Sequence, residues 1–252
     1  SPWIGMENFT RFFSSYNFGL LLKNTIGISV YSILVGFPIP IVFALMLNYL
    51  KNKYLKKTVQ MVSYAPYFIS TVVMCGMITI FLNPDTGIFN TIRGFFGMES
   101  VDFLGKPELF KSIYVWTGVW QGVGFGAIIY IAALAGVDMG QHEAAIIDGA
   151  TLLQRIRYVD LPAILPTAVI MMILNMGSIL NIGYEKVIAM QNQNNLSMSE
   201  VITTYSYKVS LVSTFPDYPY STAIGLFQSV VGLVLILITN KIADKLTGNG
   251  FI

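Results

Sequence analysis

The sequence has few charged side chains. Asp, Glu, Lys and Arg together make up 11% of its 252 residues, whereas soluble domains carry about 25%. Hydrophobic residues make up 54%, and the mean hydropathy is +0.65. The formal net charge of +2 gives no strong attraction to a polyanion, so nucleic acid is not indicated as a partner. The scarcity of charge excludes an ordinary soluble domain and indicates a protein embedded in membrane lipid.

Cysteine and histidine are nearly absent. The single cysteine, Cys75, lies in an apolar run, so cysteines build neither a disulfide nor a zinc site, and we interpret it as a packing residue. The single histidine, His142, has no second ligand or nucleophile arranged with it, and we interpret it as a solvated surface residue. No Gly-x-x-x-x-Gly-Lys-Ser/Thr loop is present to hold nucleotide phosphates. We therefore expect this chain to bind neither a metal nor a nucleotide.

Long apolar runs are what the sequence has instead. Five runs contain no Asp, Glu, Lys, Arg or His, and each is near or above the roughly 20 residues that a helix needs to cross a bilayer. They are too long and too uniformly apolar to be barrel strands. We therefore predict an all-α polytopic membrane protein. The predicted spans are Asn24–Leu47, Gln60–Leu82, Ser112–Val137, Ala163–Tyr184 and Thr222–Asn240.

The density of Lys and Arg indicates the orientation. Eight of the 15 basic residues fall in the loops 48–59 and 138–161 and in the tail from residue 241. The other seven are spread over longer segments on the opposite side. Because cytoplasmic loops carry an excess of Lys and Arg, we expect these two loops and the tail to be cytoplasmic.

The loop 138–161 carries a distinctive pattern. Glu143-Ala144-Ala145 is followed after three residues by Gly149. Nine residues, an aliphatic position and one further residue then lead to Leu161-Pro162. Asp138 can cap a first helix that Gly149 ends in a left-handed turn, and 151–154 has the form of a capping box that starts a second helix. The pattern predicts a compact exposed knob offered to a partner. An amphipathic loop that lies on the lipid surface is the alternative interpretation.

This spacing resembles the EAA loop of importer-type ABC permeases, with Val159 at the position where the family usually has isoleucine. In that family the loop is the coupling helix that docks onto the ATPase subunit. The resemblance implies a type I, maltose-permease-like transmembrane domain. The residues it implies for ATPase coupling are Glu143, Ala144, Ala145, Asp148, Gly149, Leu152 and Pro162.

Longer segments resemble the polysaccharide, or LplB-like, branch of the carbohydrate permeases. These segments are 114–125, 129–134, 181–186 and 201–205. The resemblance implies a multi-pass protein of the bacterial plasma membrane that imports an oligosaccharide delivered by an extracellular solute-binding lipoprotein. It also implies a second homologous permease subunit and a cytoplasmic ABC ATPase dimer as partners. ATP and Mg would bind to that ATPase, and this chain would bind no cofactor.

The expected domain organisation follows from this topology. Five spans with a cytoplasmic 138–161 loop leave the amino end outside, and Pro2 to Phe9 resembles the segment after the first helix of carbohydrate permeases. We therefore expect a further helix upstream and six helices in the native protein. The expected parts are an extracellular amphipathic segment at 1–23, a transmembrane domain at 24–241 and a cytoplasmic tail at 242–252.

Aromatic and amide side chains within the predicted spans are suited to sugar, because sugars favour flat aromatic faces and neutral hydrogen-bonding groups. Asn175, Ser178 and Asn181 repeat at three-residue spacing, which predicts a polar stripe on one helical face. Unpaired amides are costly in hydrocarbon, so such residues face either a water-filled path or a neighbouring helix. The residues predicted to line the path are Trp120, Gln121, Phe125, Asn175, Ser178 and Asn181.

Other functional classes have less support. A secondary carrier usually places ionisable groups within its spans, and all five predicted spans lack them. A membrane-embedded enzyme would need a cluster of His, Asp or Glu, a Ser/Lys dyad or a metal set at membrane depth, and the sequence offers none. An ABC permease for a non-sugar solute is the alternative within the same class.

Overall fold

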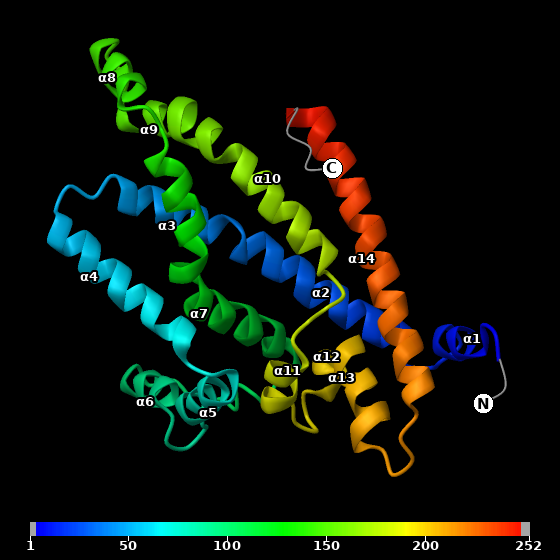
Figure 1. Cartoon of the computed structure of the whole chain (residues 1–252). Helices are drawn as coiled ribbons and strands as arrows, with labels where there is room; N and C mark the ends of the chain where they lie inside the picture. Colours follow the sequence, from blue (N-terminus) through cyan, green and yellow to red (C-terminus); the bar gives the residue numbers. More distant parts are fainter. Residues whose placement is uncertain (1–3, 248–252) are drawn as a thin grey trace. The chain divides into compact units, whose positions relative to one another are not determined.

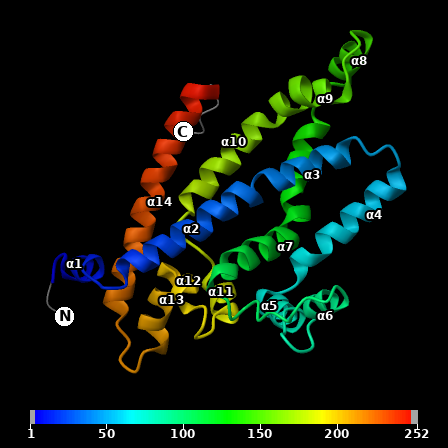
Figure 2. The same cartoon turned by 180° about the vertical axis from the view of Figure 1, so that it is seen from behind.

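The computed structural model of the protein describes residues 4–247, and over this range the chain is helical without any β-strand (Figures 1 and 2). This confirms the predicted all-α class. Among the elements, η1 is a 3₁₀-helix, and η2 and η3 are π-helices. In chain order the elements are α1 (Glu7–Phe13), α2 (Phe18–Gly36), α3 (Pro38–Asn48), α4 (Lys53–Tyr64), η1 (Ala65–Phe68), α5 (Thr71–Phe81), α6 (Ile88–Phe95), α7 (Pro107–Ala135), α8 (Met139–Ile147), α9 (Leu152–Arg155), η2 (Ile156–Asp160), α10 (Leu161–Gly177), α11 (Tyr184–Met190), α12 (Leu196–Ser199), α13 (Ile202–Tyr207), η3 (Lys208–Val212) and α14 (Tyr218–Thr247).

Four helical stretches among the described residues are long and apolar enough to cross a membrane, and a bent pair of helices gives a fifth candidate. Each of the four exceeds the roughly 20 residues that a bilayer requires. The polytopic prediction is therefore confirmed. The four stretches are Phe18–Asn48, Pro107–Ala135, Leu152–Gly177 and Tyr218–Lys245.

The second predicted span is not one straight helix. Lys53–Phe68 and Thr71–Phe81 pass the test for a span only together, and they are bent by 100°. Pro66 has no N–H to continue the helical ladder, and the Ser70 hydroxyl caps a new helix by accepting from the Val73 amide at 3.4 Å. The prediction of a continuous helix over 60–82 is thus wrong, because a proline and a capping serine interrupt it.

The fourth predicted span is displaced toward the amino end. The helix begins at Leu152, continues through η2 and ends at Gly177, so residues 178–183 are not helical. The π-turn of η2 brings the Leu161 amide to the Ile156 carbonyl just before Pro162, which cannot donate a hydrogen bond. The expectation that helix extends from Ala163 to Tyr184 is therefore wrong at both ends.

The described residues fall into two compact units. Unit 1 comprises the described parts of 1–32, 69–117 and 177–234, and unit 2 those of 33–68, 118–176 and 235–252. Unit 1 has one apolar cluster around Met74, Phe110 and Val201 and another around Phe12, Ile202 and Tyr220. Among its described residues, unit 2 has one cluster, in which Ala44, Tyr130 and Ile164 are buried together. These clusters fix the helices that carry the candidate sites.

Unit 1 satisfies the backbone of the non-helical segment 178–183 with side chains. Backbone outside a helix is tolerated at membrane depth only where its polar groups find partners or line a cavity. Three carbonyl groups of this segment accept hydrogen bonds from neighbouring elements. The pairs are Ser29 Oγ to Ile179 O, Gln228 Nε2 to Leu180 O and Thr203 Oγ1 to Ile182 O.

Candidate functional site

The first half of the coupling loop, which we define as residues 138–161, is the short helix α8. The Asp138 carboxylate caps it by accepting from the Gly140 amide at 2.9 Å. Gly149 has φ of +75° and ends the helix, while the Ala150 amide donates back to the Ala145 carbonyl at 2.8 Å. This is the left-handed helix end that favours glycine. The structure thus has the cap and the turn that the sequence predicts.

The second half begins with the predicted capping box. The Gln154 side chain accepts from the Thr151 amide at 2.7 Å, and the Thr151 hydroxyl accepts from the Gln154 amide. Helix α9 then runs without a break through η2 into α10. The second half of the coupling loop is therefore continuous with a candidate span.

Six of the seven residues predicted for ATPase coupling lie on α8, α9 and the turn between them, Pro162 lies at the start of α10, and most are exposed. Of the seven, only Ala145 is partly covered. Sequence reasoning missed the larger exposed apolar side chains beside them, the most exposed being Ile147 at 85%. The sequence feature that could have indicated them is the presence of aliphatic residues within a short loop whose helices begin at polar capping residues. These additional residues are Met139, Ile146, Ile147 and Leu153.

His142 is not a solvated residue, so that interpretation is wrong. Its side chain is 12% exposed, and its Nε2 lies 3.4 Å from Oδ1 of Asp160. Its ring meets the Tyr49 ring edge to face, with centroids 6.4 Å apart. This cluster could not be predicted from the sequence, because many residues separate Tyr49, His142 and Asp160.

In unit 2, α7 carries the predicted aromatic path residues on its surface. Trp120 and Phe125 are both exposed, and the Phe125 ring stacks on Tyr67 of η1 with centroids 3.8 Å apart and planes within 4°. Gln121 is partly buried. Tyr67 is an aromatic residue that sequence reasoning did not select, because it is remote in sequence from α7.

The predicted amide stripe does not form one helical face. Asn175 lies in α10, where its Nδ2 donates to the Met171 carbonyl at 2.8 Å. Ser178 and Asn181 lie in the non-helical segment of unit 1 and are exposed. The three-residue spacing therefore does not translate into a stripe, because the helix ends at Gly177.

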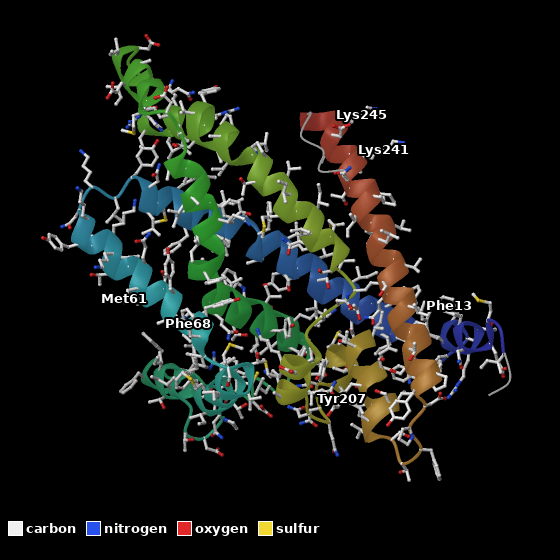
Figure 3. All side chains as sticks on the ribbon, in the orientation of Figure 1. Phe13, Met61, Phe68, Tyr207, Lys241 and Lys245 are labelled. Carbon is white, nitrogen blue, oxygen red and sulfur yellow. The ribbon has the colours of Figure 1, made fainter. Side chains whose placement is uncertain are left out.

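Unit 1 also holds an open cavity of about 1110 Å³ beside the segment 185–221. Two ion pairs lie at this cavity: Lys208 Nζ is 2.6 Å from Glu200, and Arg11 is 2.6 Å from Asp217. Tyr207, labelled in Figure 3, lines it and stacks on Tyr184 with centroids 4.9 Å apart. The cavity thus combines aromatic faces with charges that are already paired.

Comparison with known proteins places these features in a family. Residues 36–248 match the family described as binding-protein-dependent transport system inner membrane component. The chain is 38% identical to protein LplB of Bacillus subtilis over 99% of this chain and 78% of that protein. It is 37% identical to the polygalacturonan/rhamnogalacturonan transport system permease protein YteP of the same organism, over 99% of this chain and 77% of that protein.

Solved structures agree with this. A chain of a bacterial ABC transporter involved in the import of the acidic polysaccharide alginate superimposes with a TM-score of 0.94, at 38% identity over 98% of this chain and 86% of that chain. The same TM-score is found for a bacterial alginate ABC transporter in complex with an alginate pentasaccharide-bound periplasmic protein, at 37% identity over 98% and 85% of the two chains. The chain, with its exposed coupling loop and its membrane-spanning helices, therefore belongs to the family of inner membrane components of binding-protein-dependent transport systems, the permeases of ABC importers.

Proposed function

We propose that this chain is one half of the pore of an ATP-driven importer and carries an oligosaccharide handed over by an extracellular solute-binding lipoprotein. A second, homologous permease supplies the other half. A cytoplasmic ABC ATPase dimer binds ATP and Mg, and this chain takes no part in the hydrolysis. The observation that carries the proposal is the exposed coupling loop, with its two capped helices and its apolar surface.

The coupling loop is suited to docking on another protein. Its apolar side chains Ile146, Ile147 and Leu153 are exposed together with the small Ala144, which permits close approach of a partner surface. Exposed apolar patches rimmed by polar groups are typical of interaction sites, and Glu143 and Asp148 supply that rim. The basic residues expected on the same side include Lys241 and Lys245 near the end of α14, labelled in Figure 3.

The cargo class rests on the relatives and on the chemistry of the predicted path. YteP is named for the transport of polygalacturonan and rhamnogalacturonan, and the matched solved structures are of bacterial ABC transporters for alginate. Trp120 and Phe125 offer aromatic faces, and Asn181 offers an amide in the non-helical segment 178–183.

Loss of one hydrogen bond to sugar costs about 1 kcal/mol, or about fivefold in affinity. Asn181→Ala should therefore lower uptake by proteoliposomes without changing assembly.

Co-purification tests the proposed ATPase contact. Ile147→Asp places a charge on the most exposed apolar side chain of α8 and should remove most of the ATPase from the purified complex, together with transport. Tyr54→Asp is the matched control, because Tyr54 is equally exposed on α4 and lies outside the coupling loop. Full ATPase retention and wild-type uptake in Ile147→Asp would contradict the proposal.

A further inference from the structure

A buried carboxylate lies beneath the coupling loop. Asp160, the last residue of η2, is fully buried. The Tyr49 hydroxyl donates to its Oδ2 at 2.5 Å, and His142 Nε2 lies 3.4 Å from its Oδ1. Tyr49 directly follows α3, His142 belongs to α8, and Asp160 directly precedes α10. One carboxylate therefore joins three elements of unit 2.

The cluster depends on all its members. A buried carboxylate is costly unless it is paired and hydrogen-bonded. Among the described residues Oδ1 of Asp160 makes no hydrogen bond, and His142 Nε2 is the group within ion-pair distance of it. Burial and the hydrogen bond to Asp160 raise the pKa of Tyr49 to about 12, which keeps its hydroxyl a neutral donor. The Arg155 guanidinium lies 5.5 Å from the Tyr49 ring centroid and adds a cation to the cluster.

The helix α8 has little else to hold it in place. None of its residues is buried, and His142 is the side chain through which it reaches the buried carboxylate. Its connections on either side contain Gly136 and Gly149, the second in the left-handed conformation. A helix attached only through such turns could tilt with a moving partner and leave the spans where they are.

We propose that Asp160 is a positioning residue that ties the coupling helix α8, through His142, to the end of α3, through Tyr49, and to the start of α10. The inference rests on the proposed function, in which the ATPase docks on α8. Movement of the ATPase then displaces α3 and α10 together with α8. Without the tie, the ATPase still docks and hydrolyses ATP, but the spans do not follow.

The complete complex in proteoliposomes, supplied with loaded binding protein, tests this tie. The measurement is sugar transported per ATP hydrolysed, together with the ATPase retained on purification. His142→Ala should keep the ATPase bound and hydrolysing but lower sugar per ATP at least fivefold. His142→Gln, whose Nε2 reaches toward the same carboxylate oxygen, should restore the ratio to within about twofold. Tyr49→Phe should also lower the ratio, whereas Tyr54→Phe, an exposed control, should not.

The mobility of a spin label on α8 reports directly whether this helix is held by the contact between His142 and Asp160. A nitroxide at position 141, introduced as Gln141→Cys with Cys75→Ser, should be more mobile in His142→Ala than in the wild type or in His142→Gln. The proposal is overturned if His142→Ala transports as much sugar per ATP as the wild type, or if His142→Gln fails to restore it. It is also overturned if His142→Ala does not assemble while Tyr49→Phe couples normally. Absence of the ATPase from the wild-type complex would instead contradict the proposed function.

Discussion

At the scale of single residues, the shape of the coupling loop depends on Gly149. Its φ of +75° is disfavoured for side chains with a Cβ, at a cost of roughly 1–2 kcal/mol. No neighbouring atom lies within 4 Å of a Cβ built there, so this cost comes from the backbone rather than from a clash. The position therefore separates the effect of turn geometry from the effect of side-chain bulk.

We expect Gly149→Val to weaken ATPase co-purification and transport, because a β-branched residue resists the left-handed turn. Gly149→Asn should stay close to wild type, since asparagine adopts that conformation more readily. ATPase retained on the purified complex is the measurement. If Val and Asn behave alike, the position acts through the space it leaves for a partner and not through its φ.

Lys186 is a buried cation in unit 1. Its Nζ donates to the Tyr114 carbonyl at 2.7 Å and lies 4.4 Å from the centroid of that tyrosine ring. It belongs to α11, outside the candidate spans. Burial lowers the pKa of Lys186 to about 8, well below its value in an unfolded chain. The charged form is thus disfavoured by folding.

The sign of the pH dependence follows from this difference. Between about pH 8 and 10.5 the unfolded chain binds a proton that the folded chain has lost, so stability rises with pH in this window. We expect the thermal midpoint of the purified protein to increase from pH 7 to pH 9. Lys186→Met should remove much of that increase. An unchanged pH profile in this variant would show that other groups cause it.

At the scale of helices, α14 carries two glycines with different surroundings. A Cβ on Gly232 would collide with the Gly177 carbonyl oxygen, whereas one on Gly225 would meet nothing within 4 Å. Both glycines lie in the same helix and in the same unit. The backbone of α14 at Gly232 therefore packs closely against Gly177, the last residue of α10.

We expect Gly232→Ala to destabilise the protein by about 1–3 kcal/mol, because backbone must move to admit the methyl group. Gly225→Ala should be neutral or stabilising, by up to about 1 kcal/mol, since alanine is the better helix former. Thermal unfolding of the detergent-solubilised variants compares the two. Equal stability of both variants would contradict the close approach.

Two of the predicted spans are interrupted in the structure. Pro66 and Ser70 divide the second predicted span, and the helix end at Gly177 leaves residues 178–183 outside a helix. Side chains from neighbouring elements then supply the missing hydrogen bonds, as Gln228 does for Leu180 at 2.6 Å. A polar residue in a span can therefore serve the backbone of another element rather than a solute.

At the scale of the whole molecule, one coupling loop sets the expected assembly. The chain presents a single Glu-Ala-Ala loop, whereas an ATPase dimer offers two docking surfaces. We therefore expect the purified transporter to contain one copy of this chain, one copy of a second permease and two ATPase copies. Native mass spectrometry measures this stoichiometry. A complex with two copies of this chain and no other permease would contradict it.

Features that depend on neighbouring residues could be predicted from the sequence alone. Charge-free runs predicted the membrane-spanning class because hydrocarbon excludes charge and requires helical backbone. Asp138, Gly149 and the Thr151–Gln154 box predicted the two helices of the coupling loop correctly, because capping acts over a few residues. The resemblance to ABC permeases is confirmed, because the family of binding-protein-dependent transport system inner membrane components matches residues 36–248.

Features that depend on residues far apart in the chain became visible only in the folded protein. The end of α10 at Gly177 and the partners of segment 178–183 required Ser29, Thr203 and Gln228, which lie on other elements. The stacking of Tyr67 on Phe125 and the burial of His142 against Asp160 are likewise long-range. Hydropathy and spacing describe each helix alone, whereas such contacts arise only when helices pack, which is the physical reason that the sequence did not show them.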